Sequence, residues 1–161
     1  MDYHISEMDR NYAQSIVKWN YKGQYSIYNL EDTQQSINEL LCGDYYSVSN
    51  GETVIGFYCF GKSAQVPIGN SFGAYDNKEY IDIGLGLKPD YCGKGLGLSF
   101  LHEGLGFAKR NLHIDRFRLT VASFNVRAIN VYQKAGFRVG MSFKRMSDNE
   151  AVVEFLTMTL G

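Results

Sequence analysis

Apolar residues recur along the chain with two spacings, and each spacing predicts one type of secondary structure. Short runs rich in β-branched and aromatic residues are typical of strands, whereas apolar residues three or four positions apart are typical of helices. Strands are expected at 3–6, 45–48, 53–60, 80–87, 117–122, 137–143 and 152–160. Helices are expected at 31–41, 96–110 and 125–135, and one more is expected to begin at Asp9 or Asn11.

Turn residues mark the connections between these elements. Asn50-Gly51 separates two expected strands and is typical of a type I′ hairpin turn, and Gly136 follows a helix as a C-terminal cap would. Residues 61–78 contain both glycine and proline and are expected to form a loop. The order is β-α-α-β-β-β-α-β-α-β-β without a clear linker, which predicts a mixed α/β fold, with a mixed α+β sheet, in a single domain over residues 1–161.

Composition and charge narrow the class of protein. With 45% hydrophobic and 20% charged residues, the chain is typical of a globular protein and not of a disordered one. Its 16 basic and 17 acidic side chains give a formal net charge of −1, so no broad binding of nucleic acid is expected. No stretch approaches the roughly 18 apolar residues of a membrane span, so no membrane partner is expected.

The positions of cysteine and histidine argue against disulfides and metal. The three cysteines, Cys42, Cys59 and Cys92, form no CxxC pair, which is typical of reduced thiols in a cytoplasmic protein. The start of the chain also lacks the basic and apolar regions of a secretory signal. The three histidines lack HxxxH or HExxH spacing, so no metal site is expected.

Glycine has the most uneven distribution of any residue type in the chain. Seven of the 17 glycines fall between Gly84 and Gly106. The expected strand IDIGLGLKP runs into DYCGKGLG and then into a helix, and such a turn presents backbone N–H groups at the positive end of a helix dipole. A phosphate suits this arrangement, although a tight turn without a ligand has the same pattern. The spacing fits neither a Walker A loop nor a dinucleotide-binding GxGxxG fingerprint.

Two segments resemble the signatures of a known family. Residues 92–97, CGKGLG, look like the [Q/R]xxGx[G/A] acetyl-CoA loop of the GNAT superfamily of N-acetyltransferases, and the preceding LKPDY resembles the end of that family's fourth strand. Residues 123–137, SFNVRAINVYQKAGF, resemble the second signature, N-x-x-A-x-x-x-Y-x-x-x-G-F. The order of elements also matches the GNAT fold. The resemblance implies a mostly antiparallel central sheet, splayed between its fourth and fifth strands.

The resemblance also implies acetyl-CoA as co-substrate, without a metal. Its pantetheine arm is expected to pair with the fourth strand and its pyrophosphate with the loop; the expected contacts are Leu85, Gly86, Leu87, Cys92, Gly93, Lys94, Gly95, Leu96, Gly97, Asn125 and Asn130. Cys92 departs from the family, whose loop begins with Arg or Gln; its backbone amide can serve, but its side chain cannot. Gly84 and Gly86 would permit close approach of the ligand, whereas only packing on the sheet is expected to explain Gly104 and Gly106.

Tyr132 matches the position of the family's usual general acid. Attack of an amine on the thioester expels a thiolate, and a phenol can donate a proton to it. A core role beside Phe137 is the alternative. The amine must itself lose a proton, and family members often use a carboxylate of the fourth strand, for which Glu79 and Asp82 are candidates. Because the two positions differ in parity, they are expected on opposite faces of a regular strand.

The implied activity is direct transfer of an acetyl group from acetyl-CoA to a primary amine, carried by a small molecule or a peptide. Aromatic residues between the first two helices either line the acceptor site or simply pack there; they are Trp19, Tyr21, Tyr25 and Tyr28. A non-catalytic acyl-CoA-binding sensor on the same fold is the other function left open. The sequence is compatible with a monomer or a homodimer.

Overall fold

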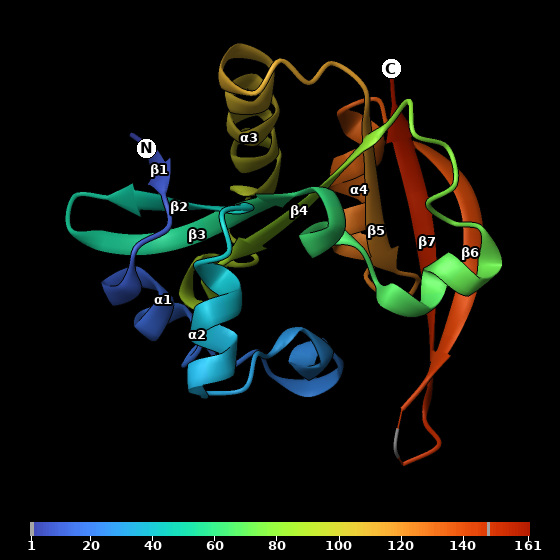
Figure 1. Ribbon diagram of the computed structural model, residues 1–161, viewed down its shortest axis with the longest axis horizontal. Helices are drawn as coiled ribbons and strands as arrows, with labels where there is room; N and C mark the ends of the chain where they lie inside the picture. Colours follow the sequence, from blue (N-terminus) through green and yellow to red (C-terminus); the bar gives the residue numbers. More distant parts are fainter. Residues whose placement is uncertain (1, 148) are drawn as a thin grey trace. The chain divides into compact units, whose positions relative to one another are not determined.

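The computed structural model describes residues 2–147 and 149–161, in two compact units (Figure 1). One unit comprises the chain up to Cys59 together with Leu85–Leu96, and the other comprises Phe60–Gly84 and Gly97–Gly161. The strands are β1 (His4–Glu7), β2 (Tyr45–Asn50), β3 (Thr53–Phe60), β4 (Ile81–Leu87), β5 (Phe117–Ala122), β6 (Arg138–Met146) and β7 (Val152–Leu160). The helices are α1 (Arg10–Ile16), α2 (Gln34–Leu40), α3 (Gly97–Asn111) and α4 (Val126–Lys134).

The strands follow the order β1-β2-β3-β4-β5-β7-β6 in the sheet. β4 and β5 pair in parallel, while β1–β2, β2–β3, β5–β7 and β6–β7 pair antiparallel. The predicted element order and the mixed, mostly antiparallel fold are therefore confirmed. The predicted limits of β3, β5 and β7 are also confirmed, whereas β6 extends beyond the predicted end at residue 143. None of the helices in the described ranges has the length and apolarity that a membrane crossing requires.

In the first unit, α1 and α2 lie on one side of the β2–β3 hairpin (Figure 1). Their apolar faces share a core cluster made of Ala13, Ile16, Val17, Ile37, Leu40 and Val54. Each helix begins at a side chain that accepts a backbone N–H. Asp9 Oδ1 accepts from Tyr12 at 2.8 Å, and Thr33 Oγ1 accepts from Ser36 at 3.1 Å. The cap at Asp9 was one of the two predicted, while α2 begins later than predicted because Thr33 caps it.

The turn between β2 and β3 differs from the predicted one. Asn50 pairs with Thr53, so the loop consists of Gly51 and Glu52. Gly51 has a φ of +68°, and Glu52 is not among the described residues with positive φ. A type I′ turn needs positive φ at both loop residues, whereas a type II′ turn needs it only at the first. The type I′ prediction is therefore wrong, because Asn50 belongs to the strand pairing and not to the turn.

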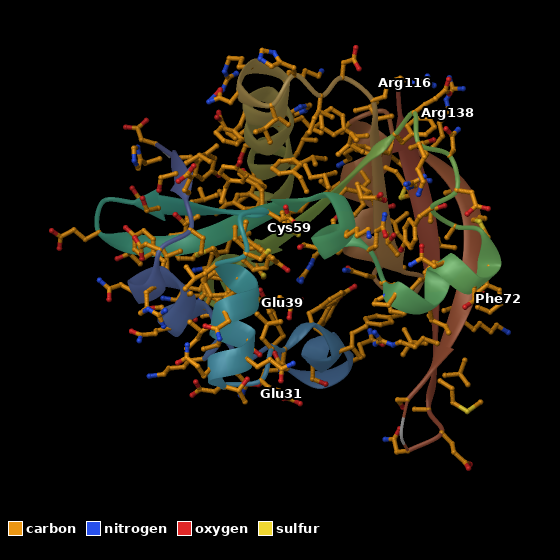
Figure 2. All side chains as sticks on the ribbon, viewed as in Figure 1. Glu31, Glu39, Cys59, Phe72, Arg116 and Arg138 are labelled. Carbon is orange, nitrogen blue, oxygen red and sulfur yellow. The ribbon has the colours of Figure 1, made fainter. Side chains whose placement is uncertain are left out.

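An aromatic stack covers part of the sheet in the second unit. Phe72, an exposed residue of a short 3₁₀ helix, stacks on Phe143 at a centroid distance of 6.1 Å (Figure 2). Phe143 in turn stacks on Phe155 at 5.6 Å. Gly69 lies against the same rings, because a Cβ there would be 2.8 Å from the ring of Tyr75 and 2.9 Å from that of Phe143. Only glycine fits at this position.

Two of the three glycines of α3, Gly104 and Gly106, lie in the interior of the helix and differ from each other. Gly104 lies among the buried residues of the helix. Gly106 is half-buried, and the three atoms nearest to a Cβ placed there all belong to the guanidinium of Arg110, at 2.9 Å and beyond. The expectation that packing on the sheet explains Gly106 is therefore wrong, since only a flexible side chain would be displaced.

Gly106→Ala is expected to stabilise the protein by up to about 1 kcal/mol, because alanine loses less backbone freedom in a helix. Urea denaturation followed by circular dichroism measures this change. Gly69→Ala is the matched control and is expected to lower the unfolding midpoint, because its Cβ would overlap the rings of Tyr75 and Phe143. A lower midpoint for Gly106→Ala as well would show that α3 requires the glycine.

Candidate functional site

The turn between β4 and α3, residues 92–97, has an unusual backbone. Gly93 and Gly95 have φ values of +73° and +75°, whereas Lys94 between them is not among the described residues with positive φ. All three residues are exposed. Positive φ at alternate residues is the pattern of an anion-binding nest, in which successive N–H groups turn to one side. The chain then passes directly into α3, a helix of 15 residues that begins at Gly97. We call residues 92–97 the glycine turn.

Two side chains hold the end of β4 just before the glycine turn. The hydroxyl of Tyr21 donates a hydrogen bond to the carbonyl oxygen of Leu87 at 2.7 Å. The thiol of Cys92 donates to the same oxygen at 3.4 Å and to the carbonyl of Lys88 at 3.6 Å. The side chain of Cys92 therefore joins the first residue of the glycine turn to the residues that precede it. Because the carbonyl of Leu87 is taken, a pantetheine arm can pair with Leu87 at most through its N–H group.

Gly86, which was predicted to let a ligand approach the strand, has a packing reason of its own. A Cβ at Gly86 would lie 2.3 Å from Cε1 of Phe57. Phe57 is held in place by Trp19, whose ring stacks on it at 6.2 Å, and by Tyr45 at 5.8 Å. Packing alone thus demands glycine here. Leu85, beside it in β4, is half-buried, as is Leu96 in the glycine turn.

Asp82 lies in a buried ion pair. Nε and Nη2 of Arg118 each donate to its carboxylate at 2.8 Å, and Nε2 of Gln65 donates at 2.9 Å. The exposed fractions of the two charged side chains are only 3% and 4%. The hydrogen bonds with Asp82 raise the pKa of Arg118 above its usual value, so the guanidinium stays charged. Asp82 cannot take a proton from an amine without breaking this pair.

Glu79 lies before β4 and not within it, so the parity argument does not apply to it. Its carboxylate is exposed and forms a salt bridge of 3.2 Å with Arg116, which Figure 2 labels. Arg116 also donates to the hydroxyl of Tyr80 at 3.1 Å and covers the ring of that residue. Of the two predicted carboxylates, Glu79 is thus the one that solvent reaches.

The residues of the second signature lie in and beside α4. Asn125 caps the helix, because its Oδ1 accepts from the N–H of Ala128 at 3.2 Å. Contact of Asn125 with a ligand stays a prediction. Asn130 is exposed on α4, whereas Tyr132 is half-buried, with its ring 6.1 Å from that of Phe137. The packing beside Phe137 is thus observed, and proton donation by Tyr132 stays a prediction.

The sequence reasoning missed Phe57 and Arg118 at these positions, and it named Tyr21 only as an aromatic residue near the acceptor site, not as a hydrogen-bond donor to β4. A signal for Arg118 was present, because Asp82 and Arg118 are the only charged residues of two mostly apolar strands, IDIGLGL and FRLTVA, and have opposite charges. Charged residues are almost never fully buried unless they are paired. The contacts of Tyr21 and Phe57 with β4 leave no such mark in the sequence.

A comparison with models of protein families identifies the family of the chain. The family model described as the acetyltransferase (GNAT) domain matches residues 4–138 of the chain. The chain belongs to the GNAT acetyltransferase family. It is therefore an acyltransferase, as the two motifs predicted, and the family assignment favours an enzyme over a non-catalytic sensor.

Solved structures of this GNAT fold are similar over nearly the whole chain. A GNAT acetyltransferase from Bacillus anthracis has a TM-score of 0.71 at 16% identity, covering 98% of this chain and 93% of its own. A spermidine/spermine N-acetyltransferase from Vibrio cholerae has 0.71 at 15%, covering 99% and 94%. A putative acetyltransferase from Salmonella typhimurium with its cofactor acetyl-CoA has 0.66 at 17%, covering 98% and 92%. At these identities the likeness shows the fold alone.

Among curated proteins, a mycothiol acetyltransferase from Propionibacterium freudenreichii subsp. shermanii is 38% identical over 55 residues. The match covers 34% of this GNAT chain and 17% of that protein. The matched segment is thus a small part of the length of this relative.

Asp82→Asn is expected to destabilise the protein by roughly 3–5 kcal/mol, because the buried guanidinium of Arg118 loses its counter-charge. Urea denaturation measures the loss. Replacing both partners, Asp82→Asn together with Arg118→Met, is expected to recover part of it, since no unpaired charge is then buried. A variant Asp82→Asn that keeps its stability but loses turnover would instead place Asp82 in proton transfer.

Proposed function

We propose that the protein transfers an acetyl group from acetyl-CoA directly to a primary amine, and that residues 1–161 act as one GNAT domain. The observation that carries the proposal is the glycine turn, whose exposed backbone has the geometry of an anion nest and leads into a long helix. Two structural neighbours support it: one contains acetyl-CoA, and another is named an N-acetyltransferase of spermidine and spermine.

The groups of the glycine turn suit the phosphates of acetyl-CoA, which supplies an activated acetyl thioester when bound. Gly93, Gly95 and Gly97 would hold the pyrophosphate through backbone N–H groups, and Lys94 adds a mobile positive charge. Pantetheine would pair with the backbone of Leu85 and of the residues that follow it in β4. In the described part of the chain, no group of three or more His, Cys, Asp or Glu side chains is arranged to hold a metal ion.

Tyr132 serves as the general acid in this proposal. Its phenol donates a proton to the departing thiolate as the amine takes up the acetyl group. Its place in the second signature supports this role. The carboxylate of Asp82 is occupied by Arg118, so we assign Asp82 to holding the strands in place. Glu79 is then the carboxylate candidate for accepting the amine proton, and a chain of water molecules is the other route.

The setting proposed for the enzyme is the cytoplasm. In the described part of the chain, Cys42, Cys59 and Cys92 are not joined in a disulfide. Reduced cysteines are typical of a reducing compartment.

Gly95→Asp is expected to weaken CoA binding about tenfold more than Gly95→Asn. Nothing lies within 4 Å of a Cβ at Gly95, and its φ of +75° strains both side chains in the same way. Asn and Asp both tolerate this conformation, so the comparison isolates a negative charge beside the phosphates. Calorimetric titration with CoA measures the affinities, and the difference is expected to shrink as salt is added. Equal affinities would contradict phosphate binding at the glycine turn.

Tyr132→Phe is expected to lower turnover roughly 10²- to 10⁴-fold while leaving CoA affinity unchanged, because the ring still packs on Phe137 but has no proton to donate. Release of free CoA thiol over a panel of primary amines, at several pH values, measures turnover. Tyr12→Phe is the control, since Tyr12 packs against the core of α1 and α2. Turnover by Tyr132→Phe equal to that of the unchanged protein, for every accepted amine at every pH, would exclude the acid role.

A further inference from the structure

The carbonyl of Leu87 links the glycine turn to a distant segment of the chain. It accepts hydrogen bonds from Cys92 Sγ, inside the turn, and from Tyr21 Oη, which lies 66 residues earlier. The Tyr21 bond is the shorter of the two, at 2.7 Å, a normal length for an O–H···O bond. A movement of the turn that displaces Leu87 must therefore stretch or release this bond.

Tyr21 is also fixed at its own backbone. Its N–H donates to Oδ1 of Asn29 at 2.6 Å, and Nδ2 of Asn29 donates back to the carbonyl of Tyr21 at 3.3 Å. The ring of Tyr21 meets that of Tyr28 edge-on, with the centroids 6.5 Å apart. These contacts close residues 20–30, which we call the connector, around the 3₁₀ helix Gly23–Tyr28. We therefore expect the residues of the connector to move together when Tyr21 moves.

The hydroxyl of Tyr21 keeps its proton under ordinary conditions. Burial raises the pKa of Tyr21 above its usual value, and the neighbouring thiol of Cys92 raises it further. The phenol thus remains a donor at neutral and mildly alkaline pH. The hydrogen bond from Tyr21 to Leu87 can therefore form throughout this pH range.

We propose that Tyr21 is a positioning residue that couples the glycine turn to the connector, so that binding of CoA at the turn orders the connector. The inference rests on the proposed binding of CoA phosphates there. A ligand that fixes the turn also fixes Leu87 and Cys92, and the connector then loses freedom through Tyr21. Coupling of this kind is reciprocal, so an amine that contacts the connector binds more tightly when CoA is already bound.

Hydrogen exchange with and without saturating CoA tests the coupling without an identified amine. In the unchanged protein and in Tyr12→Phe, CoA is expected to slow exchange both in residues 92–97 and in the connector. In Tyr21→Phe, CoA is still expected to slow exchange in residues 92–97. The protection that CoA induces in the connector is expected to fall roughly 2- to 10-fold, the factor that corresponds to the free energy of one hydrogen bond. Asn29→Ala is the second variant and is expected to behave in the same way, because it frees the backbone of Tyr21.

The outcomes separate this inference from the proposed function. Protection of residues 92–97 without protection of the connector in the unchanged protein overturns the coupling alone. So does undiminished protection of the connector in Tyr21→Phe, or in Asn29→Ala should Tyr21→Phe fail to fold. CoA-induced protection at neither place overturns the proposed function, and the coupling with it.

Discussion

The ion pair of Asp82 and Arg118 is the interaction on which the second unit depends. The two residues are register partners in the parallel pairing of β4 with β5, so their side-chain bonds reinforce the backbone pairing. Taking two charges out of water costs several kcal/mol per ion, and the cost is offset only when the remaining hydrogen-bonding groups are satisfied. A one-residue slip of either strand would turn its charge to the other face. The pair therefore fixes the register of β4, from which the glycine turn continues.

The same pair orders the long connection between β3 and β4, which contains two short 3₁₀ helices, Gly61–Ala64 and Pro67–Phe72. Gln65 donates to Asp82, and Nη1 of Arg118 donates to the carbonyl of Asn77 at 2.9 Å. Between these points the hydroxyl of Tyr75 accepts the N–H of Val66 at 2.9 Å, and the guanidinium of Arg118 lies 5.2 Å from the centre of its ring. Hydrogen bonds of polar side chains thus hold residues 61–80 together, as backbone hydrogen bonds hold the strands of a sheet together. These contacts fix the course of residues 61–80 up to Glu79 and the start of β4.

Local features of the fold could be predicted from the sequence, and its long-range contacts could not. Asp9 as a cap, the glycine turn and the limits of β5 follow from neighbouring residues, because capping, positive φ and periodicity act over a few positions. The bond from Tyr21 to Leu87 joins residues 66 apart, and no local pattern encodes the partner. At the β2–β3 hairpin, the pairing of Asn50 with Thr53 overrides the preference of Asn50-Gly51 for a type I′ turn. Among the candidate site residues, the motifs predicted Tyr132 and the glycine turn, but no pattern predicted the residues that surround Asp82.

The first unit is made of two separate stretches of chain, and this has a consequence for its synthesis. β3 and the helices beside it leave the ribosome before residues 85–96, which complete the unit. At about 5–20 residues per second, β3 waits a few seconds for β4 to cover its open edge. An open edge is a template for pairing with other nascent chains. Translation speed between residues 60 and 96, and chaperones that shield the edge during this interval, would therefore influence the yield of folded protein.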